Sequence, residues 1–244
     1  MSTPASTDPQ TRRLCVAIDG PAGAGKSTVS RRLAERLGYV LLDTGALYRT
    51  VALMASRAGL AWEDPDGIGA LAGALASGDR LRLERGEVSA LGGSGVRVLV
   101  DGEDISAAIR APEVSVGASR VSSIPAVRAA LLEAQRSVGR QGGVVAEGRD
   151  IGTVVFPQAE VKFFLTASPE VRARRRYDEL QARGLAASFE ATLAEVIERD
   201  RADTERAVAP LRRAEDALLI DSSSAGAEEL VESMARVVEE RACR

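Results

Sequence analysis

The chain has 244 residues, enough for one α/β domain with insertions, and 45% of them are hydrophobic, so a core can form. It contains no histidine, which excludes histidine-ligated metal centres, Ser-His-Asp triads and imidazole general bases. The net charge of −3 gives no global reason to expect nucleic acid or an anionic membrane as a partner, so any anion site must be local.

The cysteines and the first residues add further limits. Cys15 and Cys243 form neither a CxxC pair nor a zinc site, and we expect no structural disulfide. Residues 1–13 are rich in Ser, Thr and Pro and lack the apolar core of a signal peptide, so we predict a disordered tail there. No stretch approaches the 18 apolar residues of a membrane span, and we expect a cytoplasmic protein.

The first part of the chain alternates between strand and helix patterns. Residues 14–18 form a short apolar run typical of a buried strand, and a glycine-rich turn follows it. Helical spacing at 27–37 and at 46–58 ends each time at a glycine, and a second apolar run at 39–42 lies between them. This order predicts the start of a parallel sheet flanked by helices.

The middle of the chain has a different pattern. Residues 78–104 hold two apolar runs separated by the turn-forming segment Gly92-Gly-Ser-Gly95, which predicts a small antiparallel insert. The rest of the chain predicts, in order, a helix from 125 to about 140, strands at 143–146 and 161–165, two arginine-rich helices within 169–206, a last strand at 217–220 and a closing helix near 227–241.

The turn after the first strand carries a motif for nucleotide binding. Its sequence matches GxxxxGK[ST] in full. Backbone N–H groups of such a loop can surround triphosphate oxygens, and the start of the next helix adds partial positive charge. Lys26 would reach the β and γ oxygens, and the Ser27 hydroxyl would ligate Mg²⁺. The predicted ATP-binding residues of this loop are Gly20, Pro21, Ala22, Gly23, Ala24, Gly25, Lys26, Ser27 and Thr28.

Lysine usage supports the motif. Lys26 and Lys162 are the only lysines among 32 basic residues, and all the others are arginine. A compact ammonium group therefore stands at the one position of the motif that requires it. Lys162 falls within an apolar run, and we expect it to have a structural role.

A P-loop alone leaves several classes of protein open. A GTPase needs an Asn-Lys-x-Asp motif, which is impossible here because neither lysine follows an asparagine. No DxxG element follows the second strand, an ABC-type signature is missing, and the chain is short for a motor protein. The small-molecule kinases remain.

Four blocks of sequence, in order along the chain, resemble bacterial cytidylate kinases. They run from Ile18 to Thr28, Leu42 to Arg49, Ala146 to Pro157 and Glu198 to Leu211. Residues 101–110 are also similar to the enlarged nucleotide-binding region of the long bacterial form. The resemblance implies an α/β fold of the P-loop NTPase type: a parallel sheet flanked by helices, an inserted small α+β nucleotide-binding region, and a helical lid.

The resemblance also implies how the chain is divided. Residues 14–244 would form a single kinase domain. Its parts would be a core at 14–60, 119–168 and 207–244, an insert for the nucleoside monophosphate at about 61–118, and a lid at about 169–206.

Roles for individual residues follow from the same resemblance. Lys26, Arg149, Arg199 and Arg206 would act in catalysis, and Arg175 would be the lid arginine on the ATP side. In the acceptor site, Arg49 and the three catalytic arginines would hold phosphate through their guanidinium forks. Asp203 would hold the sugar hydroxyls, and Ser119, Arg128 and Asp150 would read the cytosine edge. Thr44 stands where similar enzymes often have Ser, and either hydroxyl can donate. The implied CMP-binding set is Thr44, Arg49, Ser119, Arg128, Arg149, Asp150, Arg199, Asp203 and Arg206.

The choice of base has a physical argument of its own. Cytosine offers an N4 amino donor where uracil offers an O4 acceptor. A carboxylate such as Asp150 would accept from the first and repel the second, which is worth roughly 1–3 kcal/mol of discrimination.

Each group of site residues also has a structural alternative. The arginines at 172, 174, 175 and 176 could form a solvated helix face. Arg199, Asp203 and Arg206 share one helix face and could be a surface ladder of ion pairs. Ser122 or Ser123 could replace Ser119, and Asp43 could be an ordinary turn residue.

The resemblance therefore implies transfer of the γ-phosphoryl group of MgATP to CMP or dCMP by a monomer, and nothing in the sequence indicates nucleic-acid or membrane partners. No general base is required, because the acceptor phosphate is largely dianionic near neutral pH. Two alternatives stay open: a kinase for another acceptor such as UMP, shikimate or a sugar acid, and a non-catalytic ATP-binding switch.

Overall fold

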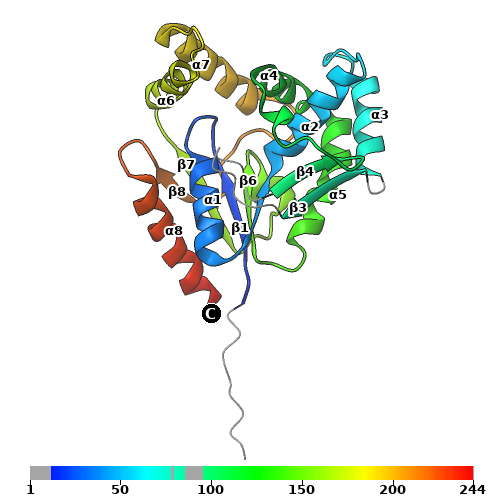
Figure 1. The fold of residues 1–244 in the computed structure, drawn as a ribbon. Helices are drawn as coiled ribbons and strands as arrows, with labels where there is room; N and C mark the ends of the chain where they lie inside the picture. Colours follow the sequence, from blue (N-terminus) through cyan, green and yellow to red (C-terminus); the bar gives the residue numbers. More distant parts are fainter. Residues whose placement is uncertain (1–11, 78–79, 86–95, 244) are drawn as a thin grey trace, which may run out of the picture.

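A computed structural model describes residues 12–77, 80–85 and 96–243 (Figure 1). Of the tail expected at 1–13, residues 1–11 lie outside the described residues. The turn expected at 92–95 also lies outside them. Arg12 pairs with Glu160, and Arg13 donates a hydrogen bond to the carbonyl of Gly38, so both residues contact the folded domain.

A five-stranded parallel sheet forms the centre of the molecule, in the order β2-β6-β1-β7-β8. Parallel strands place all their carboxyl ends at one edge, and β1 stands in the middle, with β6 on one side and β7 on the other. The predicted parallel sheet is thus confirmed. The strands are β1 (Cys15–Asp19), β2 (Val40–Asp43), β6 (Val144–Gly148), β7 (Val161–Thr166) and β8 (Leu218–Asp221).

The side chains of β1 alternate between two hydrophobic clusters, one on each face of the sheet. Val16 and Ile18 pack with helices α1 (Lys26–Leu37) and α8 (Ala227–Ala242), which lie next to each other in Figure 1. Cys15 and Ala17 face the opposite cluster, which includes residues of the single π-helical turn η2. The central strand β1 is therefore buried on both faces, as is typical of a parallel sheet, whereas the edge strand β8 is mostly exposed.

A third hydrophobic cluster lies in the inserted part of the chain. It joins Ile68, Val98 and Val114 of the insert to Val51 before it and Leu131 after it. The insert therefore shares one core with the helices on either side of it, and this core crosses the implied boundaries at 60 and 118. Its elements are α2 (Thr44–Arg57), α3 (Pro65–Ala76), β3 (Leu81–Arg85), β4 (Val96–Val100), β5 (Glu103–Asp104), η1 (Ala108–Arg110), α4 (Pro112–Val121) and α5 (Pro125–Gly139).

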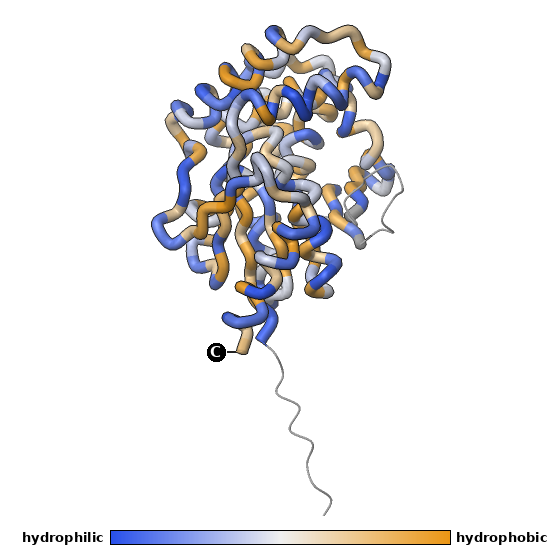
Figure 2. Tube along the Cα trace, turned by 90° about the vertical axis from the view of Figure 1, so that its left-hand side faces the viewer, coloured by the Kyte–Doolittle hydropathy of each residue, from blue (hydrophilic) through white to orange (hydrophobic). Residues whose placement is uncertain are grey.

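Two helices, α6 (Pro169–Ala182) and α7 (Phe189–Glu205), cover the carboxyl edge of the sheet, as predicted (Figure 1). The rings of Tyr177 and Phe189 meet edge to face at 6.4 Å, and the guanidinium of Arg174 stacks 4.4 Å from the Phe189 ring. Figure 2 shows many hydrophilic positions along these helices, whereas hydrophobic stretches concentrate in the strands below. Among the described residues, no helix is long and apolar enough to cross a bilayer.

Candidate active site

The predicted P-loop connects β1 to α1 at the centre of the carboxyl edge. Gly20 has a φ of 149°, and a Cβ placed there would lie 1.9 Å from the carbonyl oxygen of Leu165, so only glycine fits. Gly25 has a φ of 88° and directly precedes α1, which begins at Lys26, one residue earlier than predicted. The loop therefore ends on a helix N-terminus, where phosphate binding is favoured.

Lys26 is 7% exposed, and its Nζ donates a hydrogen bond of 2.7 Å to the carbonyl of Pro21 within the loop. Burial and then the charge of Arg149 lower the pKa of Lys26, while Glu147 and Asp203 oppose this change. Lys162, the other lysine, donates to the carbonyl of Pro157 and pairs with Asp216, which agrees with a structural role.

A cavity of about 650 Å³ opens beside the P-loop. It is bounded by the start of α1, the carboxyl ends of β2 and β6, the insert and the lid helix α6. Of the predicted residues, Ser27, Thr28 and Arg49 line it. Its other lining residues are Arg31, Leu41, Asp43, Arg110, Pro112, Ser115, Glu147, Arg176, Glu179 and Arg183.

Glu147 is a site residue that the sequence analysis missed. It lies near the end of β6, is 4% exposed and lines the cavity. Burial and then the charge of Asp43 raise its pKa to about 7, although Lys26 and a hydrogen bond from Ser27 lower it. Its strand-end position, like that of Asp43, was the available signal, because both carboxylates end neighbouring parallel strands.

Asp43 does more than form a turn. Its side chain caps α2 by accepting from the N–H of Ala46 at 3.1 Å, and its other oxygen pairs with Arg49 at 2.6 Å. The capped helix begins at Thr44, two residues before the predicted start. Thr44 is buried, and its hydroxyl donates to the carbonyl of Glu147 at 2.8 Å, so it links α2 to β6.

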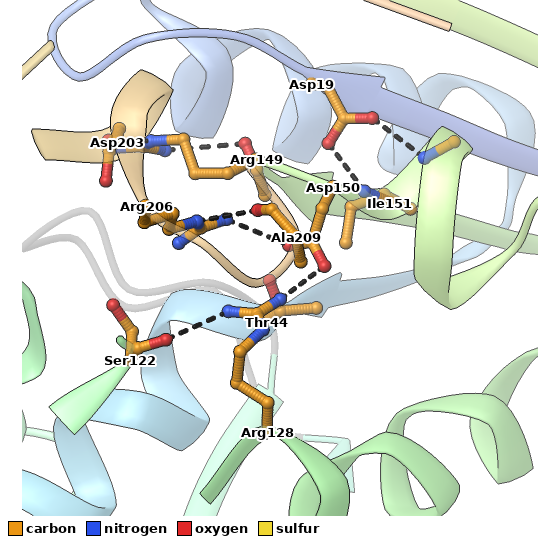
Figure 3. A network of polar contacts seen from close by, with 12 residues as sticks. Asp19, Thr44, Ser122, Arg128, Arg149, Asp150, Ile151, Asp203, Arg206 and Ala209 are labelled. Atoms are coloured by element: carbon orange, nitrogen blue, oxygen red, sulfur yellow. Dashed lines mark hydrogen bonds and ion pairs between the residues drawn. The ribbon is translucent and has the colours of Figure 1, made fainter. Parts of the chain in front are cut away.

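Asp150 is the centre of a buried ion-pair network just beyond β6 (Figure 3). One oxygen binds Arg128 from α5, and the other lies 3.5 Å from Nη2 of Arg206. Arg206 also donates to the carbonyl of Ala209 at 2.6 Å, and Arg128 donates to the carbonyl of Ser122 at 3.2 Å. The structure thus brings together three predicted residues from three elements.

Arg149 and Asp203 form a second pair in the same region, with a distance of 2.7 Å between Nε and Oδ2 (Figure 3). Asp203 is 7% exposed. Its burial favours the neutral acid, yet the charges of Arg149, Arg199 and Arg206 lower its pKa below the ordinary value. The charge of Arg199, like that of Arg149, also acts to lower the pKa of Lys26, after the larger effect of burial. These contacts contradict a solvent-exposed ladder for Asp203.

Ser119 is less closely connected. It lies in α4, and within the described residues its hydroxyl makes no hydrogen bond to the network. Its carbonyl instead accepts from the hydroxyl of Ser122, whose own carbonyl accepts from Arg128. The serine that contacts the network directly is thus Ser122, one of the alternatives considered.

The arginines of the lid helix α6 differ strongly from one another in burial and in the groups that they contact. Arg175 donates to the carbonyl of Ser222 at 2.5 Å, and to that of Gly23 in the P-loop at 3.4 Å. Arg172 is 3% exposed, pairs with Asp200 of α7 at 2.5 Å and donates to the carbonyl of Ala22 at 3.1 Å. No local pattern distinguishes Arg172 from its neighbours, yet its contacts link the lid to the P-loop and do not belong to a solvated face.

Several buried polar atoms of the site have no hydrogen-bond partner among the described residues. Among the described residues, four such atoms occur, and three belong to Arg49, Glu147 and Arg206. Buried polar atoms are almost always hydrogen-bonded, so this concentration indicates a place where a polar ligand completes the bonding. Burial and then repulsion from Arg128 lower the pKa of Arg206, which an added anion would reverse.

The fold and the loop together define a protein of the P-loop NTPase class. The sequence matches the cytidylate kinase family over residues 16–240, and the chain belongs to this family. It is 53% identical to a cytidylate kinase of Syntrophotalea carbinolica and 54% identical to one of a Geobacter species, over 94% and 93% of this chain and 94% of each relative. An uncharacterized protein from Eubacterium ventriosum has a similar fold, with a TM-score of 0.50 at 10% identity over 93% of this chain and 99% of that one.

Proposed function

We propose that the protein transfers the γ-phosphoryl group of MgATP to CMP or dCMP, giving ADP and CDP or dCDP. The observation that carries the proposal is the buried group of Asp150, Arg128 and Arg206 just beyond the end of β6, the strand whose Glu147 lines the cavity. A carboxylate flanked by guanidinium groups offers acceptors for the N4 amino group of cytosine and donors for its O2 and N3 atoms. Membership of the cytidylate kinase family supports the same acceptor.

The arginines would supply most of the charge that the reaction needs. Arg49 and Ser27 line the same cavity. The charges of Arg149 and Arg199 act on Lys26 and, after the larger effect of burial, lower its pKa. Catalysis would consist of holding the two phosphates in line and neutralising the transferred group, because phosphoryl transfer needs little covalent chemistry from the protein. The acceptor phosphate is its own nucleophile, so a chain without histidine suffices.

The residues present fit a magnesium ion that arrives with ATP. Ser27 offers a hydroxyl, and the unpartnered Oε2 of Glu147 is a buried oxygen at the same cavity. Within the described parts of the chain, no cluster of three acidic or cysteine side chains could hold a metal by itself, so nucleotide oxygens and water would complete the shell. When bound, the ion would neutralise charge on the β and γ oxygens.

An ADP-release assay over a panel of acceptors tests the proposal. CMP and dCMP should give rapid acceptor-dependent ADP formation, UMP should be about tenfold to hundredfold poorer, and shikimate and gluconate should be inactive. Strong activity with another acceptor and little with CMP would identify that compound as the substrate instead of CMP. ATP binding without ADP formation for any acceptor would favour a nucleotide-controlled switch.

We further propose that the enzyme acts as a monomer in the cytoplasm. All proposed site residues come from one chain, so activity would need no second copy. Gel filtration at the enzyme concentration of the assay checks this, and a specific activity that rises with protein concentration would contradict it.

A further inference from the structure

Asp19 is a buried carboxylate that none of the predicted roles includes. It ends β1 immediately before the P-loop and is 3% exposed. Its Oδ1 accepts from the N–H of Ile151 at 2.7 Å, and its Oδ2 accepts from the N–H of Gly152 at 2.8 Å (Figure 3). Both oxygens are thus used to hold a segment more than 130 positions away in the sequence.

The segment that Asp19 holds is η2 (Ile151–Val155), which directly follows Asp150. The first N–H groups of any helical turn lack partners within it, and a negative charge at that end is favourable. At the other end, Arg136 from α5 donates to the carbonyls of Val154 and Val155 at 3.0 Å each. A single π-helical turn is therefore fixed at both ends by charged side chains from other elements.

We propose that Asp19 is a positioning residue of the acceptor site: by capping η2 it fixes the turn that carries Arg149 and Asp150 relative to the P-loop. The inference rests on the proposed function. Asp19 immediately precedes Gly20, the first residue of the ATP-binding loop. This one residue therefore connects that loop to the turn beside the proposed acceptor site. Space around the cap is tight, since a Cβ on Gly152 would lie 3.4 Å from Oδ2 of Asp19 and 3.1 Å from Cδ of Lys162.

Two charged groups act on the Asp19 carboxylate: Asp150 from the acceptor turn and Lys26 from α1. Burial raises the pKa of Asp19 to about 6, and Asp150 adds to the rise, although the two backbone hydrogen bonds and Lys26 lower it. Protonation of either oxygen converts an acceptor into an O–H group that cannot accept from the facing N–H. Acceptor binding should therefore weaken as the pH falls below about 6, beyond the change caused by protonation of the acceptor phosphate.

The test compares Asp19→Asn with wild type by calorimetric titration of CMP and, separately, of a non-hydrolysable ATP analogue. An amide can accept only one of the two N–H groups, so we expect the Kd for CMP to rise about tenfold while the Kd for the ATP analogue changes less than twofold. The ratio of variant to wild-type Kd for CMP should shrink below pH 6, because wild type then loses the same cap. Glu160→Gln is the matched control: its carboxylate accepts from the N–H of Cys15 at 2.9 Å, at the opposite end of β1, and both affinities should stay unchanged.

Equal CMP affinity in wild type and Asp19→Asn would overturn the inference, and so would an equal loss of both ligands. If Asp19→Asn does not fold, Arg136→Met tests the other end of the same turn, and it should also weaken CMP selectively, by about threefold. A wild-type enzyme that fails to bind CMP would refute the proposed function instead, so the two failures are distinguishable.

Discussion

The two halves of the candidate site are constructed in different ways. Apart from the lid residue Arg175, the donor half is one continuous segment of nine residues, from Gly20 to Thr28, whose shape depends on glycine conformations and on the start of α1. The acceptor half takes side chains from α2, α5, the turn after β6, and α7 with the loop after it. The first half binds with backbone, and the second with long charged side chains.

This difference has an energetic consequence. Backbone N–H groups in a loop need no countercharge, so the donor half can stay open without ligand. Guanidinium groups held close together repel one another, so the acceptor half is held by carboxylates: Asp43 binds Arg49, Asp150 binds Arg128, and Asp203 binds Arg149. Substitutions in the two halves should therefore affect different substrates, which the following predictions test.

Removing the P-loop ammonium should have the largest effect. Lys26→Ala should lower kcat by about three orders of magnitude or more with little change in thermal stability, because the group acts on transferred charge. Lys162→Ala is a matched control, since both lysines are buried and both donate to a proline carbonyl five residues earlier at 2.7 Å. The control should lose stability but keep its kcat, as steady-state assays and thermal melts would show. Near-normal turnover in Lys26→Ala would contradict the P-loop assignment.

Truncating an arginine of the acceptor half should impair the use of CMP while leaving ATP binding nearly unchanged. In Arg149→Ala, kcat/KM for CMP should fall about a hundredfold or more, since Asp203 also loses its partner. The Kd for ATP should change by less than threefold. Arg201→Ala removes an exposed arginine of α7 that pairs with Glu198 of the same helix, and it should leave both constants unchanged. Equal damage to ATP and CMP binding would show that the halves are not independent.

Changing the charge at the base-reading position should alter specificity more than rate. Asp150→Asn replaces a pure acceptor by a group that can also donate, so discrimination between CMP and UMP should fall from roughly tenfold to hundredfold towards unity. The ratio of kcat/KM for the two nucleotides measures this directly. A variant that keeps full preference for CMP would show that Asp150 does not read the base.

The same contrast explains how much of the fold and of the candidate site could be predicted from the sequence. The P-loop could be predicted because its geometry is local: the spacing of Gly20, Gly25 and Lys26 alone determines which groups converge. The strands and most helices followed from periodicity and capping, and the structure confirms them. The acceptor residues entered only through family resemblance, since nothing local indicates that Arg128 and Arg206 would meet at Asp150.

What the sequence analysis missed has an equally physical cause. Glu147 and Asp19 are acidic residues at strand ends, and an acidic residue there is also an ordinary turn former. Their roles depend on burial and on partners more than 100 positions away, such as the N–H groups of η2. The π-helical turn itself has no sequence signature, and Arg172 resembles its neighbours in the lid until the packing of α6 on the P-loop is known.

The smallest effect is expected at Thr44, when it is replaced by serine. Thr44→Ser keeps the hydroxyl that donates to the carbonyl of Glu147 at 2.8 Å and removes one buried methyl group. Stability should therefore fall by about 1 kcal/mol, while the KM for CMP should stay within twofold. Chemical denaturation and steady-state kinetics measure the two quantities.

Thr44→Ala is the informative companion, because it removes the hydroxyl as well and leaves the carbonyl of Glu147 without this partner. Since that bond joins the start of α2 to the end of β6, its loss should shift Arg49 relative to the P-loop and raise the KM for CMP about threefold to tenfold. If serine and alanine behaved alike, the methyl group rather than the hydroxyl would be the part of Thr44 that matters. The link between α2 and β6 would then have to come from Asp43 capping its helix.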